Sequence, residues 1–303
     1  MNSGQRMIKY FAILLAASLT IGIIVTVVNV GLSVVGAFVS VGDETQDKKG
    51  NHHIEDSESK REDGDGEEGG KKTMDEYALV ENLEIESSIY KIMIQEKEDI
   101  ESVKVEMRNV PSSYNVTYKE STKTLSFQDE DWVSGFFNQK RKAAKGKIYI
   151  YIPEEKQLNR VRIEMGVGTV NIHDTSMKSL DIECGVGMLS CSNVTAENAD
   201  IEGGVGSIAF KDIAFSNFQL EGGVGDIDVE GKLTGKTVVS AGMGNINIHV
   251  DGKKDNYNYN IETGLGPIYI DGEKTGDINF SNNSCSNLLD IEGGIGTIYI
   301  NFQ

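Results

Sequence analysis

IEMGVGTVNI, residues 163–172, is the stretch that decides the fold, because six further copies of the phrase follow it. They are IECGVGMLSC from Ile182, IEGGVGSIAF from Ile201, LEGGVGDIDV from Leu220, VSAGMGNINI from Val239, IETGLGPIYI from Ile261 and IEGGIGTIYI from Ile291. The first four intervals between copies are 19 residues, and the last two are 22 and 30. A fixed period near 20 residues, built of strand-like phrases, predicts a solenoid with one coil per repeat.

Within one copy, the apolar residues alternate along a strand and then change parity. Ile163 and Met165 share one strand face with Val167, whereas Val170 has the other parity. A bend is therefore expected at Gly168, since glycine tolerates the backbone angles that a bend requires. A pair of glycines recurs in every copy: Gly166, Gly168, Gly185, Gly187, Gly204, Gly206, Gly223, Gly225, Gly242, Gly244, Gly264, Gly266, Gly294 and Gly296. The expected fold is all-β: a single-stranded β-solenoid of about 19-residue coils, preceded by one N-terminal transmembrane helix.

The predicted solenoid domain covers residues 77–303. Residues 77–160 alternate less regularly and are expected to form irregular opening coils and a cap, and residues 161–303 the regular Gly-x-Gly coils. The two long intervals predict that residues around His249–Asn260 and Asp271–Asp290 bulge from the rod as loops.

The last copy of the phrase ends just before Gln303, without a visible capping helix. The final edge of the solenoid is expected to present unpaired backbone groups and Ile298 or Ile300, and either a side chain covers it or another chain pairs there. End-to-end association of copies is one hypothesis for covering that edge.

The N-terminal region predicts a membrane anchor. No charged residue occurs from Tyr10 to Gly42, which is long enough to cross a bilayer as a helix over residues 10–41. Arg6 and Lys9 precede it, so the positive-inside rule favours a cytoplasmic segment 1–9 and an extracytoplasmic solenoid. A cleaved signal peptide is the alternative, but its apolar region would be about half as long.

An acidic segment separates this span from the strands. Residues 43–76 contain 13 acidic and 6 basic residues and almost no large apolar ones, so residues 42–76 are predicted to be a disordered linker. The whole chain has a net charge of −18, which argues against nucleic acid as a partner. Cys184, Cys191 and Cys285 are too few for a disulfide framework, and Cys191 is expected to be a small buried apolar residue.

The string KIYIYIPEEKQLNRVRIEMGVGTVNI, residues 147–172, and the coils after it resemble the bacterial putative-adhesin β-solenoid domain family of unknown function. The resemblance covers roughly residues 83–303. It implies a single-stranded β-solenoid, often carried by membrane-anchored proteins of Gram-positive bacteria, with some relatives tied to envelope-stress or antimicrobial-peptide responses. It supplies no catalytic residues to carry over.

A carboxylate follows the first apolar residue of most copies, as in Glu164, and an aspartate often lies two residues earlier. The predicted acidic stripe consists of Asp181, Glu183, Asp200, Glu202, Glu221, Glu262, Asp290 and Glu292. With rungs about 4.8 Å apart, such a stripe predicts a face that binds Ca²⁺ or a polycation. The alternative is a solvated edge that keeps a β-rich rod soluble and prevents sheet-to-sheet pairing.

Other patterns of site chemistry are absent from the sequence. The calcium-binding nonapeptide repeat requires aspartate where Ile227 stands, and no Lys-Ser or Lys-Thr follows the glycines as a P-loop demands. His173 and His249 are four coils apart, about 19 Å, and cannot share an ion. No nucleophile or acid–base pair stands out, so the chain is not expected to be an enzyme or to need a cofactor.

An aromatic and basic cluster, Trp132–Phe137 followed by Lys140–Lys147, has two interpretations. Its aromatic residues could cover the open N-terminal end of the solenoid, where repeat folds need a cap. They could instead rest on an anionic membrane surface.

The sequence thus predicts a non-catalytic, single-pass cell-surface protein with an adhesin-like binding or scaffold role in the bacterial envelope. The expected partners are the membrane, through the N-terminal helix, and a cationic peptide, an envelope protein or a cell-wall component. One alternative is an envelope-stress signalling component whose span, with Gly22, Gly31, Ser33 and Gly36, contacts a membrane partner. The other is a purely structural spacer without a ligand.

Overall fold

The structure, a computed structural model, describes residues 72–110, 114–129, 146–281 and 285–303. All of them belong to one compact unit, Gly70–Gln303, which is separate from the unit Met1–Gly69. Residues 1–71, including the expected transmembrane segment, lie outside the described ranges. Within those ranges, no helix is long and apolar enough to span a membrane.

The described part of the chain forms one sheet of sixteen strands and one 3₁₀ turn, η1 (Lys254–Asn256). The strands are β1 (Lys72–Tyr77), β2 (Asn82–Lys97), β3 (Val103–Arg108), β4 (Tyr114–Lys119), β5 (Thr124–Asp129), β6 (Lys147–Pro153), β7 (Gln157–Val224), β8 (Ile227–Leu233), β9 (Lys236–Met243), β10 (Ile246–Val250), β11 (Tyr257–Leu265), β12 (Ile268–Ile270), β13 (Glu273–Thr275), β14 (Ile278–Phe280), β15 (Asn287–Ile295) and β16 (Ile298–Phe302). The predicted all-β class is confirmed. The sheet begins at Lys72, because β1 pairs with β3. The acidic linker had been expected to extend through residue 76.

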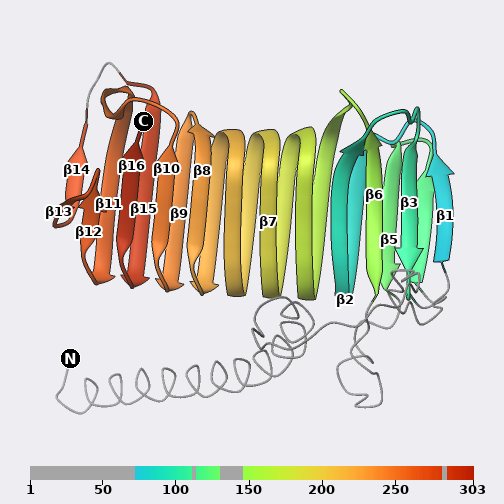
Figure 1. The fold of residues 1–303 in the computed structure, drawn as a ribbon, viewed down its shortest axis with the longest axis horizontal. Coiled ribbons are helices and arrows are strands. Elements are labelled where there is room, and N and C mark those ends of the chain that lie inside the picture. Colours follow the sequence, from blue (N-terminus) through green and yellow to red (C-terminus); the bar gives the residue numbers. More distant parts are fainter. Residues whose placement is uncertain (1–71, 111–113, 130–145, 282–284) are drawn as a thin grey trace, which may run out of the picture. The chain divides into compact units, whose positions relative to one another are not determined.

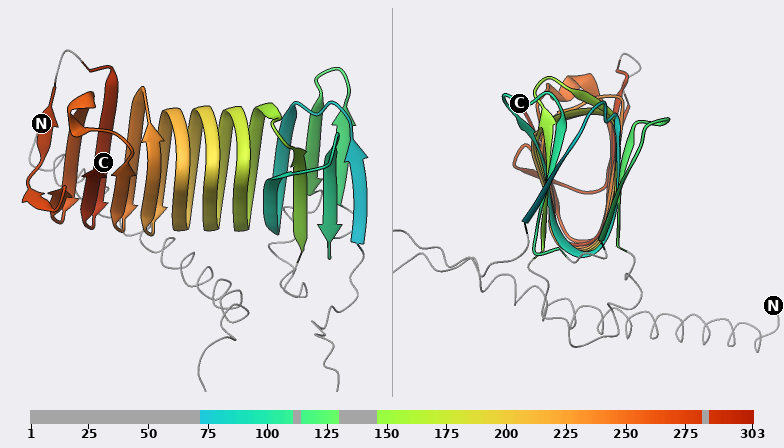
Figure 2. Two further views of the ribbon diagram at one scale, coloured as in Figure 1. Left: turned by 45° about the horizontal axis from the view of Figure 1, so that its top comes forward. Right: turned by 90° about the vertical axis from the view of Figure 1, so that its right-hand side faces the viewer.

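Each regular coil runs down one wall, turns through a bend and runs up a second wall (Figure 2). The first wall holds the half of each phrase before the glycine pair, and the second wall holds the half after it. In the middle of the unit the chain winds as one continuous strand, β7, of 68 residues (Figure 1). Parallel pairing sets Ile208 beside Ile227 and Ile227 beside Ile246, so the coils stack with a register of 19 residues.

The core lies between the two walls. Inward residues such as Ile163, Val170 and Ile172 are completely buried, as the alternation predicted. Phe210, Phe215 and Phe218 fill one coil, with ring centroids 5.3 to 6.1 Å apart. Every described strand pairs with at least one other strand of the unit, and the buried core residues of the described ranges form one cluster within it. Gly70–Gln303 is therefore the part of the chain chosen for experiments on the solenoid.

The residue between the two glycines does not face inward, contrary to the prediction for Val167. Inside the bend, a Cβ added to Gly203 would lie 2.7 Å from Cδ1 of Ile208, so the residues on the two walls meet there directly. No space remains for an inward side chain at the apex. The apex residues Met243 and Ile295 are each 49% exposed, which places this row of side chains on the outside of the bend.

A second corner, which the sequence analysis did not single out, closes each coil after the second wall. Asp174, Asn193 and Asp212 occupy it in successive coils with φ of 50°, 52° and 52°. Aspartate and asparagine tolerate this left-handed conformation better than other residues with a side chain. Asn193 also donates a 2.8 Å side-chain hydrogen bond to Asp174 in the coil before it.

The last two coils do not stack in chain order, which corrects the prediction for the C-terminal edge. The coil of β15 and β16 lies between the coil of β9 and β10 and the coil of β11 and β12 (Figure 1). Ile298 and Ile300 pair in register with β10 on one side and β12 on the other, so they do not lie at an open edge. The open edge assumed by the end-to-end hypothesis is not at these residues.

The insertion expected to bulge at Asp271–Asp290 supplies the strands that end the rod. β13 pairs antiparallel with β12, and β14 pairs antiparallel with β11. Because these strands follow β12 directly, they occupy the outer edge of the β11–β12 coil. The final coil, β15 and β16, therefore pairs with the inner edge of the β11–β12 coil. The N-terminal end also finishes in antiparallel strands, β1 on β3 and β4 on β5.

Candidate functional site: a carboxylate face on the first wall

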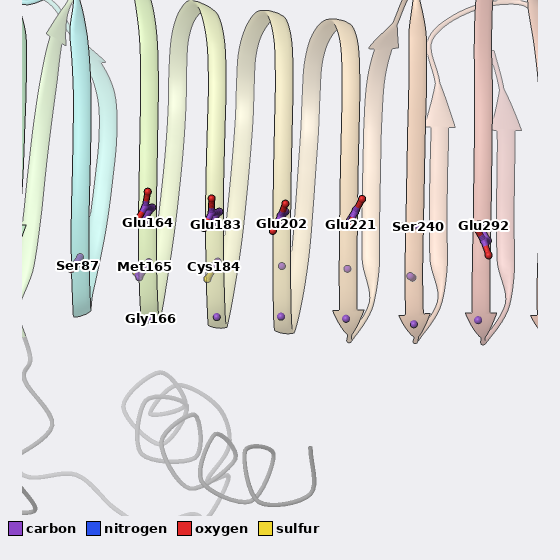
Figure 3. Close-up of a pocket in the computed structure, with 18 of the residues that line it drawn as sticks. Ser87, Glu164, Met165, Gly166, Glu183, Cys184, Glu202, Glu221, Ser240 and Glu292 are labelled. Carbon is purple, nitrogen blue, oxygen red and sulfur yellow. The ribbon is translucent and has the colours of Figure 1, made fainter. Parts of the chain in front are cut away.

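On nearly every coil, one glutamate lies at the same height on the first wall. Figure 3 shows Glu164, Glu183, Glu202 and Glu221 on successive coils, then Ser240, then Glu292. Register pairs place Ser240 between Glu221 and Glu292, and Glu262 beside Glu292 on the last coil. The row therefore follows the rod, with one uncharged rung at Ser240.

A long groove runs beside this row, toward the bend. Glu183, Glu202, Glu221 and Glu292 line it, whereas Glu262 does not. Between the glutamates and the bend, the groove is lined by two rows of residues. One row includes Met165, Cys184, Gly203, Gly222 and Ala241, and the other is the first glycine of each pair, such as Gly185, Gly204 and Gly223. These glycines expose backbone because a Cβ would collide with the neighbouring coil: at Gly204 it would overlap the carbonyl oxygen of Gly185. Close stacking thus produces both the bend and exposed backbone beside the carboxylates.

The aspartates of the predicted stripe lie apart from this groove. Asp181 and Asp200 line a second hollow higher on the same wall, together with Asn198, Asn217 and Lys236. Asp290 accepts a 3.1 Å hydrogen bond from the amide of Asn260. The structure thus separates the predicted stripe into a row of glutamates and a less regular group of aspartates.

Two arginines neutralise the N-terminal end of the carboxylate face. Arg162 lies 2.5 Å from Glu164 and 3.9 Å from Glu183, and Arg160 lies 2.5 Å from Asp181. The charge of Glu164 is the main cause that raises the pKa of Arg162, with smaller contributions from Asp181 and Glu183. Toward the C-terminal end, among the residues described, Glu202, Glu221 and Glu292 have no ion-pair partner within 4.0 Å.

The carboxylates do not converge on a point. Across the described ranges, no group of three His, Cys, Asp or Glu side chains is placed to hold one metal ion. The two histidines in the described ranges contact other side chains: His173 Nδ1 lies 2.5 Å from Ser192 Oγ, and His249 Nε2 lies 3.2 Å from the Asn301 amide. The cluster from Trp132 to Lys145 lies outside the described residues.

One glutamate of the row was missed by the sequence analysis. β2 contains an eighth copy of the phrase, IESSIYKIMI from Ile85, whose Glu86 pairs in register with Glu164 and lines the groove. In this copy Ser88 and Tyr90 stand in place of the two glycines, so a search for the Gly-x-Gly pattern does not find it. Both side chains are buried, each 4% exposed, and Tyr90 packs edge-on against Tyr114 with ring centroids 5.3 Å apart. The feature of the sequence that indicates this copy is the spacing from Glu86 to Ile92 and Ile94, which is the same as in the other copies.

The cysteines provide a test of this packing. Burial raises the pKa of the Cys184 thiol to about 11 and also raises the pKa of Cys191. Both thiols therefore stay protonated at pH 8, and the thiolate that reacts with disulfide reagents is not formed. We expect a thiol reagent at pH 8 to modify only the partly exposed Cys285 in the native chain.

All three cysteines should react once the chain is unfolded in guanidinium. The measurement is a colorimetric thiol count of the native chain against the denatured chain, with Cys285→Ser as the control that removes the native signal. Rapid native modification of Cys184 would contradict the described packing of the first wall.

The fold and this face define the class: a β-solenoid that displays one repeated surface. The chain belongs to the Toastrack DUF4097 family, whose profile matches residues 80–292. That match is consistent with the resemblance seen in the coil phrases. No curated protein matches the chain.

Several solved structures are similar to the chain. One is a putative adhesin from Bacteroides fragilis, with 15% identity, a TM-score of 0.42, and coverage of 76% of this chain and 97% of that chain. A putative cell adhesion protein from Clostridium sporogenes has 13% identity and a TM-score of 0.39, covering 78% and 100%. A putative lipid binding protein from Parabacteroides distasonis has 12% identity and a TM-score of 0.36, covering 78% and 98%.

Proposed function

We propose that this protein is a non-catalytic, single-pass surface protein of the bacterial envelope whose solenoid binds an extended cationic partner along the first wall. The observation that carries the proposal is the row of glutamates, one on nearly every coil, along a groove lined in part by glycines. The apolar span over residues 10–41 and the basic residues before it support the anchor and its orientation.

The geometry favours an extended ligand over a single ion. Carboxylates about 4.8 Å apart along a line repel one another, and one ion relieves only its nearest neighbours. A chain of positive charges relieves the whole row. A discrete Ca²⁺ site would need six to eight oxygens around one point. The linear row does not supply such a cage, so we propose a polycation rather than Ca²⁺ as the ligand.

The test uses residues 70–303 and an oligolysine of about 20 residues, which is long enough to follow the row in an extended conformation. Calorimetric titration at physiological salt should show saturable binding. The triple variant Glu183→Gln, Glu202→Gln and Glu221→Gln should weaken it by about tenfold, since three partly screened charge contacts of about 0.5 kcal/mol each are lost.

The control variant is Glu98→Gln, Glu101→Gln and Glu154→Gln, which removes the same charge from exposed turns away from the groove. Its affinity should stay within about threefold of the parent, because distant exposed charges are largely screened. An equal loss in both variants would show a response to net charge alone and would refute the binding face. A saturable rise in melting temperature with Ca²⁺ alone would contradict the choice of a polycation.

A further inference from the structure

The outer side of the bend carries a continuous apolar row that the proposed function does not use. We call it the apex ridge. It consists of the residue between the two bend positions of each coil, and in spatial order its members are Ile89, Val167, Val186, Val205, Val224, Met243, Ile295 and Leu265. Met243 and Ile295 are 49% exposed and Leu265 is 67% exposed, while the valines are partly buried.

The composition of the apex ridge is not explained by the core. Core filling requires apolar residues inside the coil, and inside the bend the two walls already meet, as Gly222 does with Ile227. At Met243, Ile295 and Leu265, whose side chains are 49% to 67% exposed, a polar residue would suit folding equally well. Each of the eight described coils that form the ridge nevertheless has an apolar residue there. A contiguous apolar strip on a surface is typical of an interaction site.

The local shape makes the apex ridge accessible from both sides. Glycines flank every apex residue in the regular coils, so no side chain of the same coil stands beside it. On the first wall the nearest outward side chains are the glutamates of the groove, three residues before each apex residue. A partner seated on the ridge would therefore meet an apolar line with a parallel line of negative charge on one side.

This charge pattern distinguishes between three kinds of partner for the apex ridge: a bilayer, a second copy of the chain and another protein. An anionic bilayer surface is disfavoured, because the carboxylates beside the ridge would approach its headgroups. A second copy seated ridge to ridge would bring two rows of carboxylates together. A partner with apolar residues next to lysines or arginines satisfies both lines at once.

The rung spacing suits an α-helix lying along the rod. A helix advances 5.4 Å per turn, against about 4.8 Å per coil, so its turns stay within roughly 2 Å of the rungs over about four coils. We propose that the apex ridge docks a basic amphipathic α-helix of a protein partner, with its apolar stripe on the ridge and its basic flank on the glutamates. The contact between the basic flank and the glutamates rests on the proposed function, whereas the apolar contact with the ridge does not.

The test again uses residues 70–303. The probe is a helical Leu/Lys peptide of about 15 residues with apolar positions at i, i+3, i+4 and i+7. The control peptide has the same composition in shuffled order, with no apolar stripe. The parent should bind the helical peptide at least about tenfold more tightly than the shuffled one, and peptide circular dichroism should show helix on binding.

The ridge variant is Val205→Thr, Val224→Thr and Met243→Gln. Threonine keeps the branched shape of valine, so the fold should be retained, which a melting curve checks. The preference for the helical peptide should fall below about threefold. Single substitutions give a matched pair: Met243→Gln should lower the preference, and Met74→Gln, at a site 53% exposed on β1 away from the bend, should leave it unchanged.

Each alternative gives a different result. A preference unaffected by the ridge variants would overturn the proposal. So would vesicle binding that these variants abolish, since the occupant would then be a bilayer, or self-association in sedimentation that they abolish, since it would then be a second copy. If oligolysine still binds the parent while the helical peptide shows no preference, the ridge proposal fails alone. If oligolysine also fails to bind, the proposed function fails as well.

Discussion

Gly206→Ala, a single methyl addition in a bend, should strongly destabilise the solenoid. A Cβ at Gly206 would overlap the carbonyl oxygen of Gly187, and the backbone there has a φ of 145°, which residues with a side chain rarely adopt. Overpacking and backbone strain together should cost more than about 3 kcal/mol. For a domain of this size, that lowers the melting temperature by about 10 °C.

Thermal unfolding of residues 70–303 followed by far-UV circular dichroism measures this effect. Gly276→Ala is the matched control, because a Cβ there has no atom within 4 Å and the backbone does not have a positive φ. The control should change stability by less than about 0.5 kcal/mol. Equal melting temperatures for the two variants would show that the bends are not stacked as closely as described.

Ile300→Ala should destabilise the C-terminal end more than Ile270→Ala. Ile300 lies in register between Ile248 and Ile270, with a coil on each side, and is completely buried. Ile270 has a coil on one side and only the short β13 on the other. Removing a buried isoleucine side chain costs about 2 to 5 kcal/mol, and Ile300 should lie at the upper end of that range and Ile270 at the lower end.

The midpoints of urea denaturation of the two variants decide the order of the coils. If the coils were stacked in chain order, Ile270 would be the residue between two coils and Ile300 would lie at the end. The two losses would then be reversed. Tyr299→Ala, on the same strand but 40% exposed, is the control and should cost clearly less than Ile300→Ala.

The carboxylate face was partly predictable because it follows from the period. Once each phrase is one coil, residues at the same position of the phrase align along the rod, so Glu183, Glu202 and Glu221 had to share a line. The separation of Asp181 and Asp200 into another hollow was not predictable, because the hollow is formed together with side chains of other coils, such as Asn217 and Lys236. The contacts of Arg160 and Arg162 likewise depend on side chains from neighbouring coils.

The apex ridge shows why alternation alone misplaces a side chain. Parity along a strand assigns Val167 to the inside, and this rule holds as long as the strand is straight. At the bend, Ile208 contacts the position of Gly203 across the interior and excludes the apex residue. The direction of the apex side chain is therefore decided by packing between the two walls.

By itself, the sequence determined the all-β solenoid, the 19-residue register and the inward ladder of Ile, Val and Leu, because each depends on local alternation and a fixed period. Only the tertiary structure decided the order of the final coils and the register in which β2 joins the stack. The phrases IETGLGPIYI and IEGGIGTIYI can each occupy either of two neighbouring coils. The coil of IETGLGPIYI ends the rod because β13 and β14 pair with its outer edge. The repeated phrases do not encode this pairing.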